Sequence, residues 1–178
     1  SWLLPIALFG AAVSSSTLPA PFMAVIESYS ATDSAVLFPR IVRMVQVGGV
    51  VAIPTETYYG LGANPFDGAA VARLLSIKGR PDGKPILILI GDQAQLQDLV
   101  TDVSPAAQVL METFWPGPLT LVFSASSRLP TPVTAGTGTV GVRYTSHTAL
   151  AELLRQIGPL TGTSANRSGE LPAQTAAE

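Results

Sequence analysis

The sequence predicts a single α/β domain in which helices flank one twisted, mixed β-sheet. Short apolar runs typical of buried strands alternate along the chain with segments whose apolar residues recur at helical spacing. Sixteen glycines and fifteen prolines indicate many turns between short elements. The 178 residues show no internal repeat and no linker, and this length is typical of one domain.

The first predicted element is a helix that Thr32 or Asp33 caps and that a glycine pair ends. A short buried strand at 50–53 follows, and Pro54 stops it. Residues 55–62 are then expected to form a loop at the carboxyl end of that strand, where open α/β sheets place ligands. Further strands are predicted at 86–90, 119–123, 139–143 and 160–163, and further helices at 67–79, 92–99, 105–114 and 147–157.

The two ends of the chain depart from this pattern. Residues 1–22 contain an apolar run without the basic segment that opens a signal peptide, so we interpret them as a leader-like or non-native extension. Met23 is then the expected start of the domain, which occupies 23–178. Residues 172–178 are small and polar and add no closing strand, which favours a domain truncated at its C-terminal end.

Composition excludes several classes of protein. The absence of cysteine excludes disulfides, thiolate zinc sites and a cysteine nucleophile, and it favours a reducing, cytoplasmic location. No run reaches the roughly 18 apolar residues of a membrane-spanning helix, so no membrane association is expected. The formal net charge of −2 is unlike that of a general nucleic-acid binder, so any RNA contact must be local. The single histidine, His147, is interpreted as a polar residue at the turn before a helix rather than as a base.

Three cations lie within seven positions between a predicted helix and a predicted strand. They are Lys78, Arg80 and Lys84, in a chain that has only ten lysines and arginines. Charge-assisted hydrogen bonds to phosphate oxygens are strong, and arginine and lysine offer a planar fork and a point charge for them. The cluster therefore indicates an anion site, the alternative being a solvated basic turn.

Other polar residues follow the predicted strands. Thr55 and Thr57 come after the first strand, either as ligand contacts or as an ordinary turn, and the absence of any Gly-Lys-Ser or Gly-Lys-Thr excludes a P-loop. Arg143 ends another strand, where it can clamp a carboxylate or form a salt bridge at the rim. Glu56 and Asp67 are the nearest acids, but their spacing does not support a metal site.

The last polar segment, residues 164–169, supplies hydroxyls, an amide and a cation after a strand, or else forms a turn that caps a helix. Nothing in the sequence provides an obvious covalent nucleophile with its base. Cations, hydroxyls and amides favour a phosphoryl reaction that is catalysed by positioning and charge stabilisation.

Taken in order, these stretches resemble the YrdC-like family of threonylcarbamoyl-AMP synthases over about residues 35–176. The matching segments are Pro54-Thr55-Glu56-Thr57-Tyr58-Tyr59-Gly60-Leu61-Gly62, Lys78-Gly79-Arg80-Pro81 with Lys84-Pro85, Trp115-Pro116-Gly117-Pro118-Leu119-Thr120, Gly141-Val142-Arg143 and Ser164-Ala165-Asn166-Arg167-Ser168-Gly169. Five ordered motifs are much more specific than any one of them.

The resemblance implies an enzyme that joins L-threonine, bicarbonate and ATP into threonylcarbamoyl-AMP and releases pyrophosphate. A partner complex would then transfer the threonylcarbamoyl group to an adenosine of tRNA, and weak direct binding of RNA by this chain stays open. The implied fold is a twisted α/β sheet around a concave, positively charged cavity.

The resemblance also implies roles for single residues. Lys78 and Arg80 are the expected catalytic residues; Arg80, Lys84, Thr139 and Asn166 are expected to bind ATP; and Thr57, Arg143 and Ser164 are expected to bind L-threonine. Mg²⁺ would be held by ATP and water, as this ion prefers, so no metal site built by the protein is expected.

Three other interpretations stay open. One is a carbamoyl-adenylate-forming domain of hydrogenase-maturation enzymes, although their cysteine-rich neighbours are missing here. Another is an RNA-binding module that uses the basic concave face, whose affinity would fall steeply with salt. The third is a fragment that keeps the fold without activity, because the family usually continues past residue 169 to a strand that closes the site.

Overall fold

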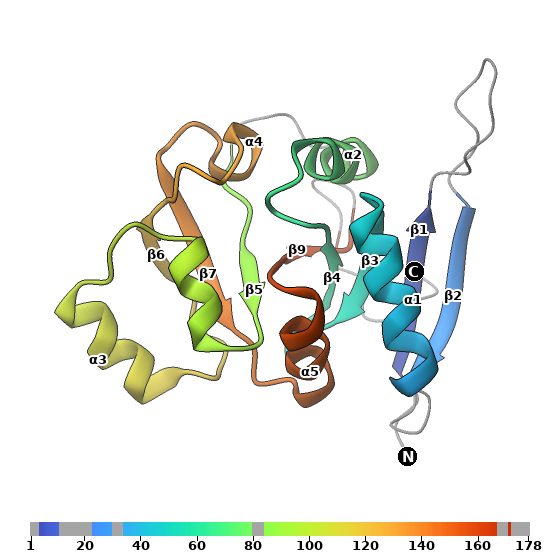
Figure 1. Cartoon of the computed structure of the whole chain (residues 1–178), viewed down its shortest axis with the longest axis horizontal. Coiled ribbons are helices and arrows are strands. Elements are labelled where there is room, and N and C mark those ends of the chain that lie inside the picture. Colours follow the sequence, from blue (N-terminus) through green and yellow to red (C-terminus); the bar gives the residue numbers. More distant parts are fainter. Residues whose placement is uncertain (1–3, 11–22, 30–33, 80–83, 167–170, 172–178) are drawn as a thin grey trace.

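The computed structural model describes residues 4–10, 23–29, 34–79, 84–166 and 171, which form two β-sheets with helices packed around them (Figure 1). The five-stranded sheet has the order β2-β1-β3-β4-β9, and the four-stranded sheet has the order β6-β7-β5-β8. The strands of the two sheets are β1 (Leu4–Gly10), β2 (Met23–Tyr29), β3 (Val50–Pro54), β4 (Tyr59–Gly62), β5 (Ile88–Ile90), β6 (Leu121–Ser124), β7 (Thr139–Tyr144), β8 (Leu160–Thr161) and β9 (Thr163–Ser164). The predicted mixed α/β class is confirmed, with the strands divided between two sheets.

The helices lie close to their predicted positions. They are α1 (Ser34–Gln46), α2 (Gly68–Lys78), the 3-10 helix η1 (Gln93–Asp98), α3 (Pro105–Phe114), the short α4 (Thr131–Thr134), which was not predicted, and α5 (Thr148–Ile157). The Asp67 carboxylate accepts from the backbone N–H groups of Ala69 and Ala70 at the start of α2, and Gly79 ends the helix with a φ of 57°. The predicted cap of α1 at residues 32–33 lies outside the described residues. No helix that the structure describes is long and apolar enough to cross a membrane.

The prediction of a loop over 55–62 is wrong in its second half. Tyr59–Gly62 forms β4, which pairs antiparallel with β3 from Pro54↔Tyr59 to Val51↔Gly62. Only the four residues of 55–58 turn between the two strands. The turn is short because the Thr55 hydroxyl donates to the carbonyl of Tyr58 at 2.6 Å and closes it.

The predicted strand at 160–163 is two strands that belong to different sheets. β8 pairs antiparallel with β5, and β9 pairs antiparallel with β4. Gly162 lies between them, and its backbone N–H donates to the carbonyl of Leu87 at 2.7 Å. A Cβ at this position would lie 2.6 Å from Cγ of Leu89, so only glycine fits where the chain crosses.

Two strands precede the part of the chain in which the sequence predicted elements. β1 pairs antiparallel with both β2 and β3, in a register that sets Ala7 opposite Ala52. β1 falls in the segment interpreted as an extension, where no strand was predicted. The residues of β1 are almost all apolar and do not alternate with polar ones, so the sequence pattern does not distinguish a strand from a leader here.

Two hydrophobic cores lie on opposite faces of the sheets. Along β3, Val50 and Ala52 belong to one core and Val51 and Ile53 to the other. This alternation follows from the two-residue period of a strand. The larger core is covered by α2, α3 and α4, and the smaller one by α1 and α5. The central strands are therefore buried between the two cores, whereas Val122 on the edge strand β6 is 69% exposed.

Trp115 belongs to the larger core. Only 9% of the residue is exposed, and its ring packs against Phe123 and edge-on against Tyr144. The indole Nε1 donates to the carbonyl of Leu119 at 2.8 Å, which satisfies its one polar atom. Trp115 is therefore part of the core and not an exposed stacking surface.

We expect Gly91→Ala to lower the free energy of unfolding by about 1–3 kcal/mol. The added Cβ would overlap the carbonyl of Ala151 and lie 2.7 Å from Cβ of Leu154, so α5 would have to move away from β5. Urea denaturation measures the effect. Gly68→Ala is the matched control, because its Cβ would meet only Pro130, at 3.8 Å, and alanine favours a helix. Equal stability of the two variants would contradict the close approach.

Candidate functional site

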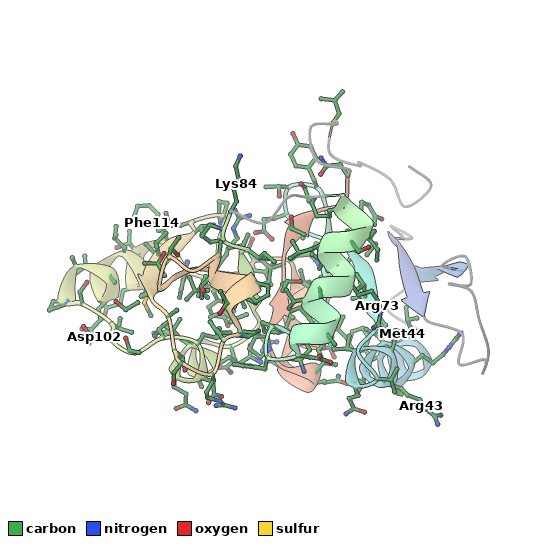
Figure 2. The ribbon with its side chains drawn as sticks, turned by 90° about the horizontal axis from the view of Figure 1, so that it is seen from above. Arg43, Met44, Arg73, Lys84, Asp102 and Phe114 are labelled. Atoms are coloured by element: carbon green, nitrogen blue, oxygen red, sulfur yellow. The ribbon has the colours of Figure 1, made fainter. Side chains whose placement is uncertain are left out.

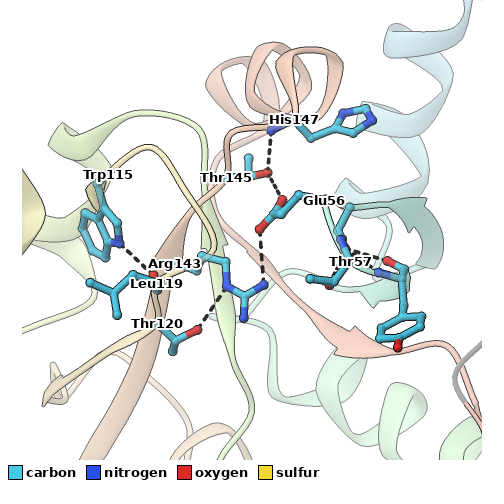
Figure 3. A network of polar contacts seen from close by, with 10 residues as sticks. Glu56, Thr57, Trp115, Leu119, Thr120, Arg143, Thr145 and His147 are labelled. Carbon is cyan, nitrogen blue, oxygen red and sulfur yellow. Dashed lines mark hydrogen bonds and ion pairs between the residues drawn. The ribbon is translucent and has the colours of Figure 1, made fainter. Parts of the chain in front are cut away.

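The best-defined polar cluster joins the turn after β3 to the end of β7 (Figure 3). Arg143, on β7, donates through Nε to the Thr120 hydroxyl at 3.1 Å and pairs through Nη1 with Oε1 of Glu56 at 3.2 Å. The other carboxylate oxygen of Glu56 accepts a 2.7 Å hydrogen bond from the hydroxyl of Thr145. Of the two interpretations of Arg143, the structure therefore shows an ion pair, although the guanidinium is not fully engaged by it.

The turn itself is organised by one hydroxyl. Thr55 Oγ1 donates to the carbonyl of Tyr58, accepts from the backbone N–H groups of Thr57 and Tyr58 and lies 3.2 Å from Thr57 Oγ1. Thr57 and Tyr58 are exposed, whereas Tyr59 is buried, and burial raises the pKa of its phenol. The fixed turn presents the side chain of Thr57 to solvent.

Lys78 lies at the end of α2 and is buried, with 4% of the residue exposed. Its Nζ donates to the backbone carbonyl of Ser164, and Oδ1 of Asn166 lies 3.5 Å away. The structure thus brings together three of the predicted site residues at the end of β9. Because an ammonium group is costly to bury without partners, these oxygens explain how the lysine is accommodated.

Two further predicted residues lie near the starts of β7 and β5, the two inner strands of the four-stranded sheet. Thr139 begins β7 and hydrogen-bonds through its hydroxyl with Thr137 at 2.9 Å. Lys84 is exposed (Figure 2) and precedes β5. Because β5 runs parallel to β7, Lys84 and Thr139 both lie toward the N-terminal ends of these strands. Arg143 is four residues further along β7, about 13 Å away at the rise of a strand. Arg80 lies outside the described residues, as do residues 167–169 of the last motif.

Sequence reasoning did not identify the contacts of Glu56. It considered this acid only as a metal ligand, and among the described residues no three histidines, cysteines, aspartates or glutamates gather to hold a metal ion. Its partner Thr145 was not singled out, and Arg143 was considered only on its own. The one available signal was position, because Glu56 lies between the two threonines of the first motif.

His147 has a structural role. Its Nδ1 accepts a hydrogen bond from the backbone N–H of Leu150 at 3.2 Å, so the side chain caps the start of α5. Its ring also borders a small apolar hollow between α1, the end of β3 and α5. The interpretation of His147 as a polar residue at the turn before a helix is confirmed.

Fixed polar groups at the ends and edges of a covered α/β sheet define a class of proteins that bind small polar ligands there. The Sua5/YciO/YrdC family model, described as "Telomere recombination", matches residues 43–178. The chain belongs to this family.

Known relatives support the assignment. The chain is 47% identical, over 132 residues, to a protein of Thiobacillus denitrificans named threonylcarbamoyl-AMP synthase, covering 74% of this chain and 70% of that protein. It is 39% identical to Sua5 of Pyrococcus abyssi, solved in complex with L-threonine, with a TM-score of 0.76 and coverage of 79% of this chain and 42% of that one. A nucleotide-bound HypF structure, at 24% identity and a TM-score of 0.67, covers 76% of this chain and 21% of its own length, and it shows the fold alone.

We expect His147→Ala to cost about 1 kcal/mol of stability, because the N–H of Leu150 loses its cap. His147→Asn should restore most of this loss, since asparagine is a strong N-cap residue. Chemical denaturation followed by circular dichroism measures both variants. A fully stable alanine variant would show that the cap contributes nothing.

Proposed function

We propose that this chain forms threonylcarbamoyl-AMP from L-threonine, bicarbonate and ATP and releases pyrophosphate. One observation carries the proposal: Arg143 is fixed beside the exposed hydroxyl turn of Thr57, in a chain 47% identical to a protein named threonylcarbamoyl-AMP synthase. A half-buried guanidinium next to hydroxyl groups suits an amino acid that carries both a carboxylate and a hydroxyl.

The threonine end of the site is assigned to three side chains. Arg143 holds the carboxylate, because a guanidinium matches its planar geometry. Thr57 and Ser164 contribute hydroxyls, from the turn after β3 and from β9. Support comes from the pairing of β4 with β9, which sets Ser164 opposite Gly60, just after that turn.

The nucleotide end is assigned to Arg80, Lys84, Thr139 and Asn166. Lys84 precedes β5, and Thr139 begins the neighbouring parallel strand β7. The exposed ammonium of Lys84 can reach a phosphate without first breaking a buried contact. Mg²⁺ would be held by the phosphates of ATP and by water, which is how this ion usually binds in such sites.

The chemistry requires two bonds to form. The amine of threonine attacks the carbon of bicarbonate, a C–O bond breaks and water leaves, which gives a carbamate. A carbamate oxygen then attacks the α-phosphate of ATP as the bond to the β-phosphate breaks and pyrophosphate leaves. Lys78 and Arg80 offset the charge that develops on the phosphates, which is electrostatic rather than covalent catalysis. A partner complex in the cytoplasm would transfer the threonylcarbamoyl group from this product to an adenosine of tRNA.

Pyrophosphate release by the purified chain should require ATP, L-threonine and bicarbonate together. Lys78→Ala should lower kcat by about a hundredfold or more, the usual loss when one charge-stabilising donor is removed. Arg43→Ala is the matched control, because Arg43 is an exposed cation on α1 (Figure 2). Release that ignores threonine, or an equal loss in the control, would contradict the proposal.

Arg143→Lys should raise the KM for L-threonine by about tenfold or more, because lysine keeps the charge but lacks the planar fork. The KM for ATP should change much less, since the nucleotide is assigned to other residues. Steady-state kinetics with each substrate varied in turn separates the two effects. Equal increases in both KM values would assign Arg143 a general structural role.

A further inference from the structure

The carboxylate of Glu56 is mostly withdrawn from solvent. Its side chain is 13% exposed and that of Arg143 is 18% exposed, so the pair between them is less screened than one on the surface. Glu56 belongs to the turn after β3, whereas Arg143 and Thr145 lie on β7 and just after it. One carboxylate therefore links the five-stranded sheet to the four-stranded sheet.

Two contacts fix the guanidinium of Arg143 (Figure 3). Nε is bound to Thr120 and Nη1 to Glu56, and among the described residues no hydrogen bond is assigned to Nη2. A guanidinium is planar, so two held nitrogens determine where the third points. Arg143 can thus offer a carboxylate ligand a donor that is already oriented.

The second carboxylate oxygen of Glu56 is also hydrogen-bonded. Its Oε2 accepts from the hydroxyl of Thr145, and the same hydroxyl accepts from the backbone N–H of His147 at 3.1 Å. Thr145 is completely buried, with 0% of the residue exposed. Because the second oxygen is anchored in this way, the carboxylate cannot easily rotate away from Arg143.

We propose that Glu56 is a positioning residue for L-threonine, acting through Arg143 and anchored by Thr145. The inference rests on the proposed function and deepens it, because it names the group that sets the orientation of the carboxylate clamp. Glu56 does not touch the substrate; it fixes the clamp before the substrate arrives, and this reduces the ordering cost of binding.

A competing role would give the opposite result. A carboxylate paired with Arg143 could occupy the site of the carboxylate of threonine, and its removal would then strengthen binding. The anchor on Thr145 favours positioning, because a competitor has to leave when the ligand binds.

The test measures kcat and the KM values for L-threonine and ATP by pyrophosphate release. Glu56→Ala should raise the threonine KM by about tenfold, the loss typical of a hydrogen bond to a charged group, and change the ATP KM by no more than about twofold. Glu56→Gln should restore the threonine KM to within about threefold of the wild type, because its amide oxygen still accepts from Arg143. Asp98→Ala is the matched control, since Asp98 also pairs with an arginine, Arg128, but at the surface.

Three results would overturn the proposal: an unchanged or lower threonine KM in Glu56→Ala, equal increases in both KM values, or no rescue by glutamine. Thr145→Val removes the hydrogen bond to Glu56 together with the one from the N–H of His147, and it should raise the threonine KM by a smaller factor. If Glu56→Ala does not fold, an unchanged threonine KM in a folded Thr145→Val variant would overturn the proposal. Failure of the proposed function is distinguishable, because the wild type would then show no threonine-dependent release, and the role of Glu56 would fall with it.

Discussion

The chain crosses from one sheet to the other at residues 160–164, and this crossing decides where the polar groups of both sheets lie. β8 completes the four-stranded sheet and β9 the five-stranded one, with only Gly162 between them. The buried hydroxyl of Thr161 secures the crossing, because it accepts from the N–H of Ala63 at 2.9 Å and donates to the carbonyl of Leu61. Both sheets are therefore held in one relative position, and the polar groups at their ends are held with them.

Two contacts of the site depend on the fixed position of the two sheets relative to each other. On one side the ion pair of Glu56 and Arg143 joins the sheets, and on another the ammonium of Lys78 reaches from α2 to the carbonyl at Ser164 on β9. In each case a charged side chain makes the contact between two elements that are far apart in the sequence. A chain with only 12% charged residues thus uses several of them to connect elements rather than to cover its surface.

Local patterns were enough to predict most helices and the approximate positions of several strands. Asp67 and Gly79 are capping residues whose chemistry acts within a few positions, so both ends of α2 could be located to within one residue. β4 and the split of β8 from β9 could not be predicted, because pairing across a turn or between sheets depends on distant partners. The site followed the same rule: Arg143 and Lys78 stood out by residue type, whereas their contacts with the carboxylate of Glu56 and the backbone carbonyl of Ser164 became visible only in three dimensions.

The different surroundings of the two lysines have a consequence for chemical labelling. Acylating reagents attack a lysine amine that is accessible and briefly unprotonated. Lys84 is exposed, whereas the amine of Lys78 is enclosed by oxygens of Ser164 and Asn166. A brief, limited treatment of the folded chain should therefore modify Lys84 well before Lys78. The order of labelling would report on the packing of α2 against β9, and a ligand that covers Lys84 would become visible as protection at that one position.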